Sequence, residues 1–268
     1  MKNKIVLSFI FVSILLILCF NPANRLIAGQ PQPNEVIHHS VKTPGGRPAQ
    51  SRVPQKKLKL VRSVKKYRRH GWFYTANALF FAKPVPVYAK GFNKAMTRLV
   101  YRNYIKKYNK SSKTKYEGSS FMDWNAKYHS CALISLVCNI SDEGSGSHPV
   151  QSYQTLTYSL TIGKVLALSD LFMANSPYLK VISDYCIQSL LRDPRKIGES
   201  FVNDGAAPSL DNYKSWVITP KGIQVYFGDY QVACYADGPS VVLIPWKVLK
   251  RVLNPHGFAG TIAFQTKK

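Results

Sequence analysis

The sequence predicts an α+β domain, with a mainly antiparallel sheet, two principal helices packed on it and a short C-terminal helix. Three observations lead to this prediction. Several segments alternate apolar and polar side chains, as half-buried strands require. Residues 92–108 and 177–193 space their apolar side chains at helical intervals. A last apolar run begins after Pro245, a residue type favoured in the first turn of a helix, and stops before Asn254 and Pro255.

The clearest strands form a hairpin near the C-terminus. Apolar and polar side chains alternate along Gly222–Phe227, and the preceding Pro-Lys-Gly turn makes Trp216–Thr219 the partner strand. Residues 241–244 are predicted to return as a third strand. The ten-residue connection before them, 229–238, is too apolar for a solvated linker. We expect it either to fold back onto the sheet or to contact a ligand.

Upstream segments supply the other predicted strands. Trp72–Phe81 is aromatic and β-compatible, and residues 126–140 and 150–160 flank the turn at 142–149. Residues 196–212 are rich in Gly, Pro and Asn and are predicted to form a surface loop.

The charge of the chain is concentrated in its first part. Residues 1–120 hold 24 Lys and Arg against 2 acidic residues, whereas the remaining 148 residues hold 13 against 11. Residues 56–69 alone contain eight cations. Such runs bind polyanions, so we expect this arm to contact anionic envelope polymers or lipid headgroups, or to be a solvated linker without a partner. Its candidate residues are Lys56, Lys57, Lys59, Arg62, Lys65, Lys66, Arg68 and Arg69.

The N-terminus has the pattern of an export signal. Met-Lys-Asn-Lys precedes an apolar run at residues 5–20, and Ala28 ends a possible cleavage site. The alternative is an uncleaved membrane anchor, although the run is shorter than the ~20 residues of a typical span. Residues 29–55 are rich in Pro, Gln, Ser and Gly and are predicted to be a disordered tether. Because export is expected, nucleic acid is not an expected partner.

The sequence contains none of the common catalytic and metal-binding motifs. The six histidines form no HExxH motif and no pair at zinc spacing, and no Gly-x-Ser-x-Gly motif is present. We therefore expect no enzyme activity, no metal and no cofactor. Four cysteines follow the apolar run, and we treated them either as buried thiols or as disulfides that would link Cys131 and Cys138 to Cys186 and Cys234.

A family resemblance covers residues 72–255 and is strongest over 153–254. The connection reads Tyr-x-Val-Ala-x-Tyr-Ala-x-Gly-Pro, with a hairpin strand before it and a strand, Ile-Pro and a helix after it. A Gly-Lys, Leu-x-Leu-x-Asp-Leu-Phe segment ends at Phe172. This order resembles the C-terminal domain of the lysozyme-sensing anti-sigma-V factor, which also occurs in some peptidoglycan deacetylases. Their Gly-Gly-Ala-His turn is replaced here by Ser-Gly-Ser-His, ending at His148.

The resemblance implies an exported envelope module that contacts cell-wall glycan or a wall-acting protein such as lysozyme. Only four residues precede the apolar run, so no sigma factor is expected as a partner. A cell-wall-modifying enzyme with an unrecognised site is the remaining alternative. The expected organisation is a signal or anchor (1–28), a disordered basic tether (29–71), the envelope domain (72–255) and a C-terminal tail (256–268). Flat amphipathic side chains anchor sugars and protein partners, so the candidate ligand-binding residues are Tyr230, Tyr235, Asp237 and Trp246.

Overall fold

The α+β prediction is confirmed by the computed structural model, which describes residues 56–69, 71–111, 118–144, 148–193 and 198–264. The predicted signal or anchor and the tether up to residue 55 lie outside these residues. The strands are β1 (Leu60–Arg69), β2 (Trp72–Phe81), β3 (Gly118–His129), β4 (Leu133–Glu143), β5 (Val150–Ser159), β6 (Lys164–Val165), β7 (Trp216–Thr219), β8 (Gly222–Phe227) and β9 (Ser240–Pro245). The helices are α1 (Val87–Ser111), α2 (Tyr178–Leu191), α3 (Glu199–Gly205), α4 (Trp246–Leu249) and α5 (Gly260–Ala263).

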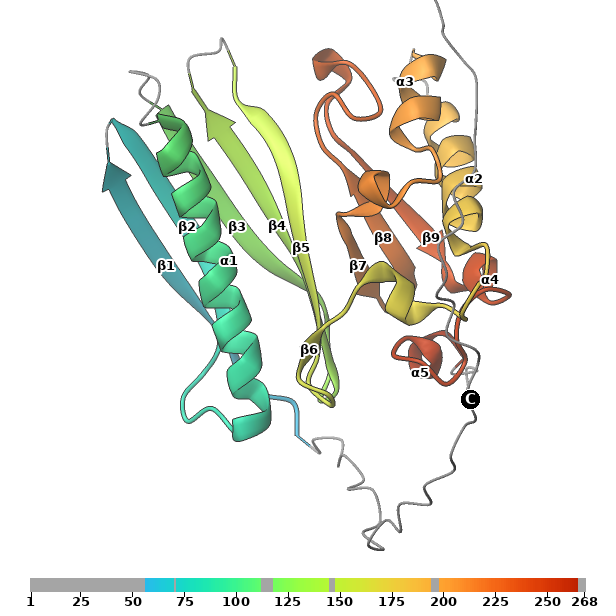
Figure 1. Cartoon of the computed structure of the whole chain (residues 1–268), viewed down its shortest axis with the longest axis horizontal. Coiled ribbons are helices and arrows are strands. Elements are labelled where there is room, and N and C mark those ends of the chain that lie inside the picture. Colours follow the sequence, from blue (N-terminus) through green and yellow to red (C-terminus); the bar gives the residue numbers. More distant parts are fainter. Residues whose placement is uncertain (1–55, 70, 112–117, 145–147, 194–197, 265–268) are drawn as a thin grey trace, which may run out of the picture. The chain divides into compact units, whose positions relative to one another are not determined.

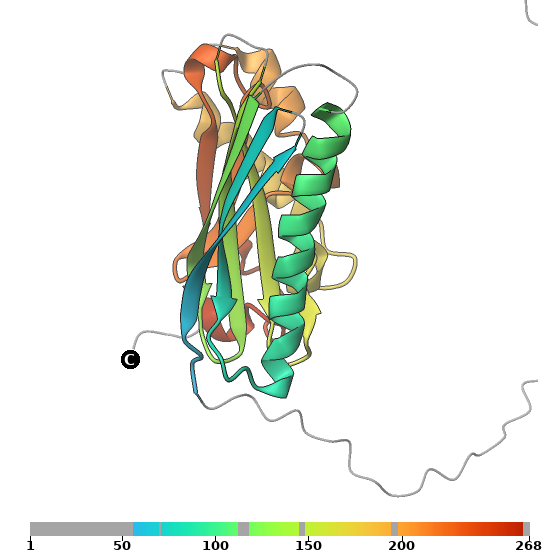
Figure 2. The same cartoon turned by 90° about the vertical axis from the view of Figure 1, so that its left-hand side faces the viewer.

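The first six strands form one sheet in the order β1-β2-β3-β4-β5-β6. Neighbouring strands are antiparallel except β2 and β3, which are parallel. A parallel pair needs a crossover connection, and α1 supplies it and lies along one face of the sheet (Figures 1 and 2). Phe92, Met96 and Val100 point from α1 into the core on that face, where they pack with Trp124 and Leu136.

The last three strands form a second sheet in the order β7-β8-β9, as the predicted hairpin and return strand required. Its outer face is covered by α2, whose buried Ile182 and Cys186 belong to the same core as Val225 and Ile244. From α1 to α2, the described chain is therefore layered as helix, sheet, sheet and helix (Figure 1).

The two sheets meet where β7 packs on β3, β4 and β5. Side-chain hydroxyls of the larger sheet satisfy backbone groups of β7. The amide of Ile218 donates to Ser135 Oγ at 2.9 Å, and that of Trp216 donates to Thr155 Oγ1 at 3.1 Å. A small apolar cluster of Val137, Val217 and Tyr226 fills the space between the sheets. The contact between the sheets involves β3, β4 and β5, and it leaves uncovered the face of β1 and β2 that is directed away from α1.

The structure corrects three sequence-based boundaries. The basic run is not all tether, because Leu60–Arg69 pairs along its whole length with β2 as the edge strand of the sheet. Residues 126–140 are not one strand, because β3 ends at His129 and a turn leads into β4. The C-terminal tail is not outside the fold, because Gly260–Ala263 forms α5 and Ala259 and Ala263 join the core.

Within the described ranges, no helix combines the length and apolarity that a membrane span requires. The four cysteines of these ranges are free thiols, so the disulfide alternative is not supported for Cys131, Cys138, Cys186 and Cys234. Cys186 is fully buried on the inner face of α2, as predicted for a core thiol.

Candidate ligand-binding groove

An open groove of about 450 Å³ lies between α3 and the connection that follows β8. Its polar wall includes Asp204 and Asn212, and its aromatic side chains are Phe201, 47% exposed, and Tyr230, 52% exposed. Cavities of this size hold small organic ligands or parts of larger ones. The remaining lining residues are Ser200, Gly205 and Gln231.

Gln231 fixes the two walls of the groove to each other. Its side-chain amide donates to the carbonyls of Gly205 at 3.2 Å and Asn212 at 3.0 Å. A Cβ on Gly205 would stand 1.7 Å from the carbonyl oxygen of Gln231, so only glycine permits this approach. Asn212 in turn donates to the carbonyls of Asp204 and Ala207, at 3.0 and 3.1 Å. The groove is thus built from a hydrogen-bonded frame rather than from a loose loop.

Tyr230 enters the groove from an unusual backbone conformation. Its φ is 66°, a left-handed value that is rare for a bulky side chain and costs of order 1 kcal/mol. The residue before it is held in place, because Asp229 exchanges hydrogen bonds with Gln151 of β5: its amide donates at 3.0 Å and its Oδ2 accepts at 2.6 Å. The surrounding structure therefore holds a large exposed ring in a conformation that the ring itself does not favour.

A row of stacked rings continues from the groove. The ring centroids of Tyr230 and Tyr235 are 5.8 Å apart, and those of Tyr235 and His148 are 3.6 Å apart with an interplanar angle of 21°. The Tyr235 hydroxyl donates to the carbonyl of Pro149 at 2.9 Å, which fixes the middle ring. Val232, in the same connection, is buried in the core. Of the two alternatives predicted for the connection, the structure shows the first, because the connection folds back onto the sheet, and it also leaves the ring of Tyr230 exposed.

Polar atoms without partners lie around the base of this connection. Among the described residues, Asp229 Oδ1, His148 Nδ1 and Ser240 Oγ are buried and make no hydrogen bond. Burial, and then the charge of Asp229, raise the pKa of Tyr153 above its ordinary value. Elsewhere in the described ranges, no three His, Cys, Asp or Glu side chains gather as metal ligands. The chemistry available in the groove is stacking and hydrogen bonding.

The four predicted ligand-binding residues separate into two groups. Tyr230 and Tyr235 stack on each other, and Asp237 ends the 3-10 turn Tyr235–Asp237, where its Oδ2 accepts from Cys234 Sγ at 3.4 Å. Trp246 lies apart from these three residues and is buried. Trp246 is 7% exposed, and its indole donates to the Pro220 carbonyl at 3.1 Å. It follows the last residue of β9, whereas the connection with Tyr230 and Tyr235 leads into the first residue of that strand.

Sequence reasoning missed the opposite wall of the groove. Residues 196–212 were expected to be an irregular loop, yet Glu199–Gly205 forms α3 and carries Phe201 and Asp204. The available signal was an aromatic residue within a run that is otherwise rich in small and polar residues.

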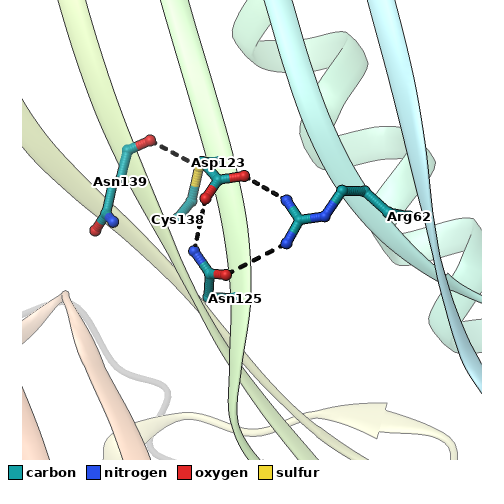
Figure 3. Close-up of polar contacts among 5 residues, drawn as sticks. All are labelled: Arg62, Asp123, Asn125, Cys138 and Asn139. Atoms are coloured by element: carbon teal, nitrogen blue, oxygen red, sulfur yellow. Dashed lines mark hydrogen bonds and ion pairs between the residues drawn. The ribbon is translucent and has the colours of Figure 1, made fainter.

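The predicted polyanion-binding residues lie apart from the groove. Lys56, Lys57 and Lys59 are exposed before β1, and Arg62, Lys65, Lys66 and Arg68 are exposed along it. The side chain of Arg69 lies outside the described part of the chain. Arg62 is engaged by other side chains, because its guanidinium donates to Asp123 and, at 3.4 Å, to Asn125 (Figure 3).

Residues 169–247 match the family described as "Protein of unknown function (DUF3298)". The sequence resemblance is thereby confirmed. The DUF3298 match contains α2, α3, the second sheet and the lining residues of the groove. The chain is also 23% identical over 134 residues to the peptidoglycan-N-acetylmuramic acid deacetylase PdaC of Bacillus subtilis (strain 168). That alignment covers 50% of this chain and 29% of the deacetylase, so it spans less than a third of the deacetylase's length.

Two solved structures share the fold. A DUF3298 family member from Bacteroides fragilis NCTC 9343 superposes with a TM-score of 0.55 at 16% identity, covering 78% of this chain and 98% of its own. A DUF3298 family protein from Pseudomonas aeruginosa PAO1 gives a TM-score of 0.55 at 11% identity, covering 79% of this chain and 99% of its own. Both matches extend well beyond the DUF3298 segment.

Proposed function

We propose that this chain is a non-catalytic, exported binding module of the bacterial cell envelope, and that the groove beside Tyr230 binds cell-wall glycan. The observation that carries the proposal is the pair of half-exposed rings, Phe201 and Tyr230, that flank the polar side chains of Asp204 and Asn212. Sugar rings offer apolar faces that stack on aromatic side chains and hydroxyls that bond to carboxylates and amides.

The charge of the groove favours an uncharged ligand. Of the lining residues that the structure describes, Asp204 is acidic and none is Lys or Arg. An anionic polymer would face this carboxylate without a compensating cation, whereas sugar hydroxyls can donate to it. The relationship to a peptidoglycan deacetylase supports a cell-wall ligand and an exported location, since the name of that relative refers to this polymer.

The test uses the full chain with insoluble peptidoglycan and with soluble wall fragments, each titrated with salt. Tyr230→Gly removes the ring and also relieves the positive φ. We expect it to weaken binding about 30-fold, the size of an aromatic hot spot, without lowering the melting temperature. Tyr101→Ala is the matched control, because Tyr101 is a similarly exposed ring, at 56%, and it belongs to α1, the helix that packs on the larger sheet. Binding should persist in several hundred millimolar salt because it does not depend on exposed cations.

Three results would contradict the proposal. Equal binding by the Tyr230 and Tyr101 variants would exclude the groove as the binding site. A wild-type chain that binds lysozyme but no wall fragment, with Tyr230→Gly reducing that binding, would favour a wall-acting protein as partner. A change in the mass of the wall fragments during incubation would show that the module is an enzyme.

A further inference from the structure

The larger sheet presents a second surface that the groove does not use. Strand residues alternate between faces. Tyr67 and Tyr74, whose tilted rings have centroids 5.7 Å apart, face α1, where Tyr74 donates to the Val100 carbonyl at 3.1 Å. The neighbours of these tyrosines, Lys66, Arg68 and Phe73, therefore point to the opposite side. The second sheet packs farther along, on β3, β4 and β5. We call the uncovered surface the cationic face and define it as Val64, Lys66, Arg68, Phe73 and Phe121.

Three apolar side chains of the cationic face are exposed to solvent. Val64 is 52% exposed, Phe73 is 50% exposed and Phe121 is 45% exposed. They belong to three adjacent strands, since β1 pairs with β2 and β2 with β3. Scattered single apolar residues are common on surfaces, but here Phe73 and Phe121 are diagonal neighbours on paired strands of one sheet face, with Val64 on the same face of β1.

The two cations of the face lie among these apolar side chains. The Arg68 guanidinium carbon lies 4.7 Å from the centroid of the Phe73 ring. Lys66 pairs across the sheet with Thr75, whose other neighbour in register is Phe121. The positive charge therefore lies along the edge strand β1, and the exposed rings lie beside it on β2 and β3.

The acidic groups on this side of the sheet are already engaged. Asp123 accepts from Arg62 and, at 2.8 Å, from Asn125 (Figure 3). Glu143 accepts from Ser119 at 3.3 Å. Among the described residues, Lys66 and Arg68 have no carboxylate partner. The charge of the whole segment points the same way. Residues 56–165 carry 20 Lys and Arg against 4 acidic residues, a balance of +16, whereas residues 166–268 carry 11 against 8, a balance of +3.

We propose that the cationic face docks on the anionic phospholipid surface of a membrane. Lys66 and Arg68 would contact headgroup phosphates, and the rings of Phe73 and Phe121 would enter the interfacial layer between the lipid headgroups. Both halves of the surface are then used, because anionic headgroups attract Lys and Arg while the interface takes up aromatic rings. A soluble polyanion would satisfy the cations but would leave the exposed rings in water, so the lipid surface is the better fit.

The test measures binding of the full chain to vesicles of phosphatidylcholine with and without about one third phosphatidylglycerol. Each cation near such a surface contributes about 1 kcal/mol, so Lys66→Gln with Arg68→Gln should weaken the partition coefficient about 30-fold. The matched control is Lys94→Gln with Arg98→Gln, which removes the same charge from exposed positions on α1, against the opposite face of the sheet. Phe73→Ser with Phe121→Ser should weaken binding about 10-fold through the loss of buried apolar area.

A second measurement guards against vesicle binding by the apolar segment at residues 5–20. Acylation of lysines by a water-soluble reagent, read by mass spectrometry, should slow several-fold at Lys66 when phosphatidylglycerol vesicles are added, but not at Lys94. Equal labelling of Lys66 with and without these vesicles would overturn the proposal, as would equal losses of binding in the two charge variants. If the two Phe substitutions change nothing and soluble polyphosphate protects Lys66 equally well, the face binds polyanions and not membranes. Melting curves of all variants confirm that each one folds.

Discussion

The two sheets of this protein are built alike and expose different chemistry. Each buries one face beneath a helix, α1 on the larger sheet and α2 on the smaller. Residues 56–165, which form the larger sheet, have a balance of +16, and the following residues have a balance of +3. The larger sheet leaves a face of cations and rings uncovered, whereas the smaller sheet carries a polar groove with two exposed rings. The same layered architecture thus supports two surfaces suited to different ligands.

The two regions also differ in what holds their surfaces in place. The cationic face belongs to three strands that pair in regular register, so its side chains are positioned by strand pairing. The groove depends on a close backbone approach at Gly205 and on the amide of Gln231. Substitutions should therefore affect the two regions unequally, and the following predictions test that difference from the largest effect to the smallest.

Gly205→Ala should be the most damaging of these changes. The new Cβ would lie 1.7 Å from a backbone oxygen of Gln231, so α3 and the connection must move apart, at a cost of about 3 kcal/mol. Thermal unfolding measures this loss. Gly144→Ala is the control near the larger sheet, because its Cβ would find its nearest neighbour, a Trp72 ring atom, at 3.4 Å, and we expect a change within about 0.5 kcal/mol. Equal effects of the two substitutions would contradict the close approach.

Cys186→Ala should destabilise the protein by about 2 kcal/mol in oxidising and reducing buffer alike, because the thiol is free and fully buried. Burial raises the pKa of the Cys186 thiol from 9.0 to about 12. Between these values the folded state retains a proton that the unfolded state releases, so the stability present below pH 9 falls as the pH rises. Chemical denaturation from pH 8 to 11 should show a shallower decline in the variant than in the wild type.

Cys234→Ala is the control for Cys186→Ala, because Cys234 is exposed and its loss should be nearly neutral. Destabilisation by Cys186→Ala that appears only without reductant would instead indicate a disulfide.

The smallest predicted effect is an acid destabilisation centred on His129 in β3. Burial, and then the charge of Lys57, lower the pKa of its imidazole from 6.5 to about 4. As the pH falls through this range the unfolded state takes up a proton that the folded state excludes, so stability is lost. Because His129 is only partly buried, we expect about 1 kcal/mol, measured by denaturation at pH 7 and pH 4. His129→Gln should reduce the acid loss and the exposed His256→Gln should not; identical curves would contradict this assignment.

The sequence determined the elements whose signals are local. The Pro-Lys-Gly turn joins β7 to β8, the aromatic and β-compatible residues of Trp72–Phe81 indicated β2, and the turn residues of 142–149 separate β4 from β5. Helical spacing indicated α1 and α2. The aromatic character of the connection after β8 indicated Tyr230 and Tyr235, and their rings stack on each other in the structure. Turn geometry and side-chain periodicity act over a few residues, so they are legible along the chain.

Only the tertiary structure decided the rest. Leu60–Arg69 is a strand because β2 pairs with it, although its own run of cations favours a solvated segment. Phe201 meets Tyr230 across the groove because Gly205 admits the backbone of Gln231 and the Gln231 amide joins the two walls. Trp246 was assigned to the site from its position in sequence, but β9 carries it to the far end of the sheet. Such contacts depend on which surfaces pack together, and that is fixed by the free energy of the whole fold rather than by any one segment.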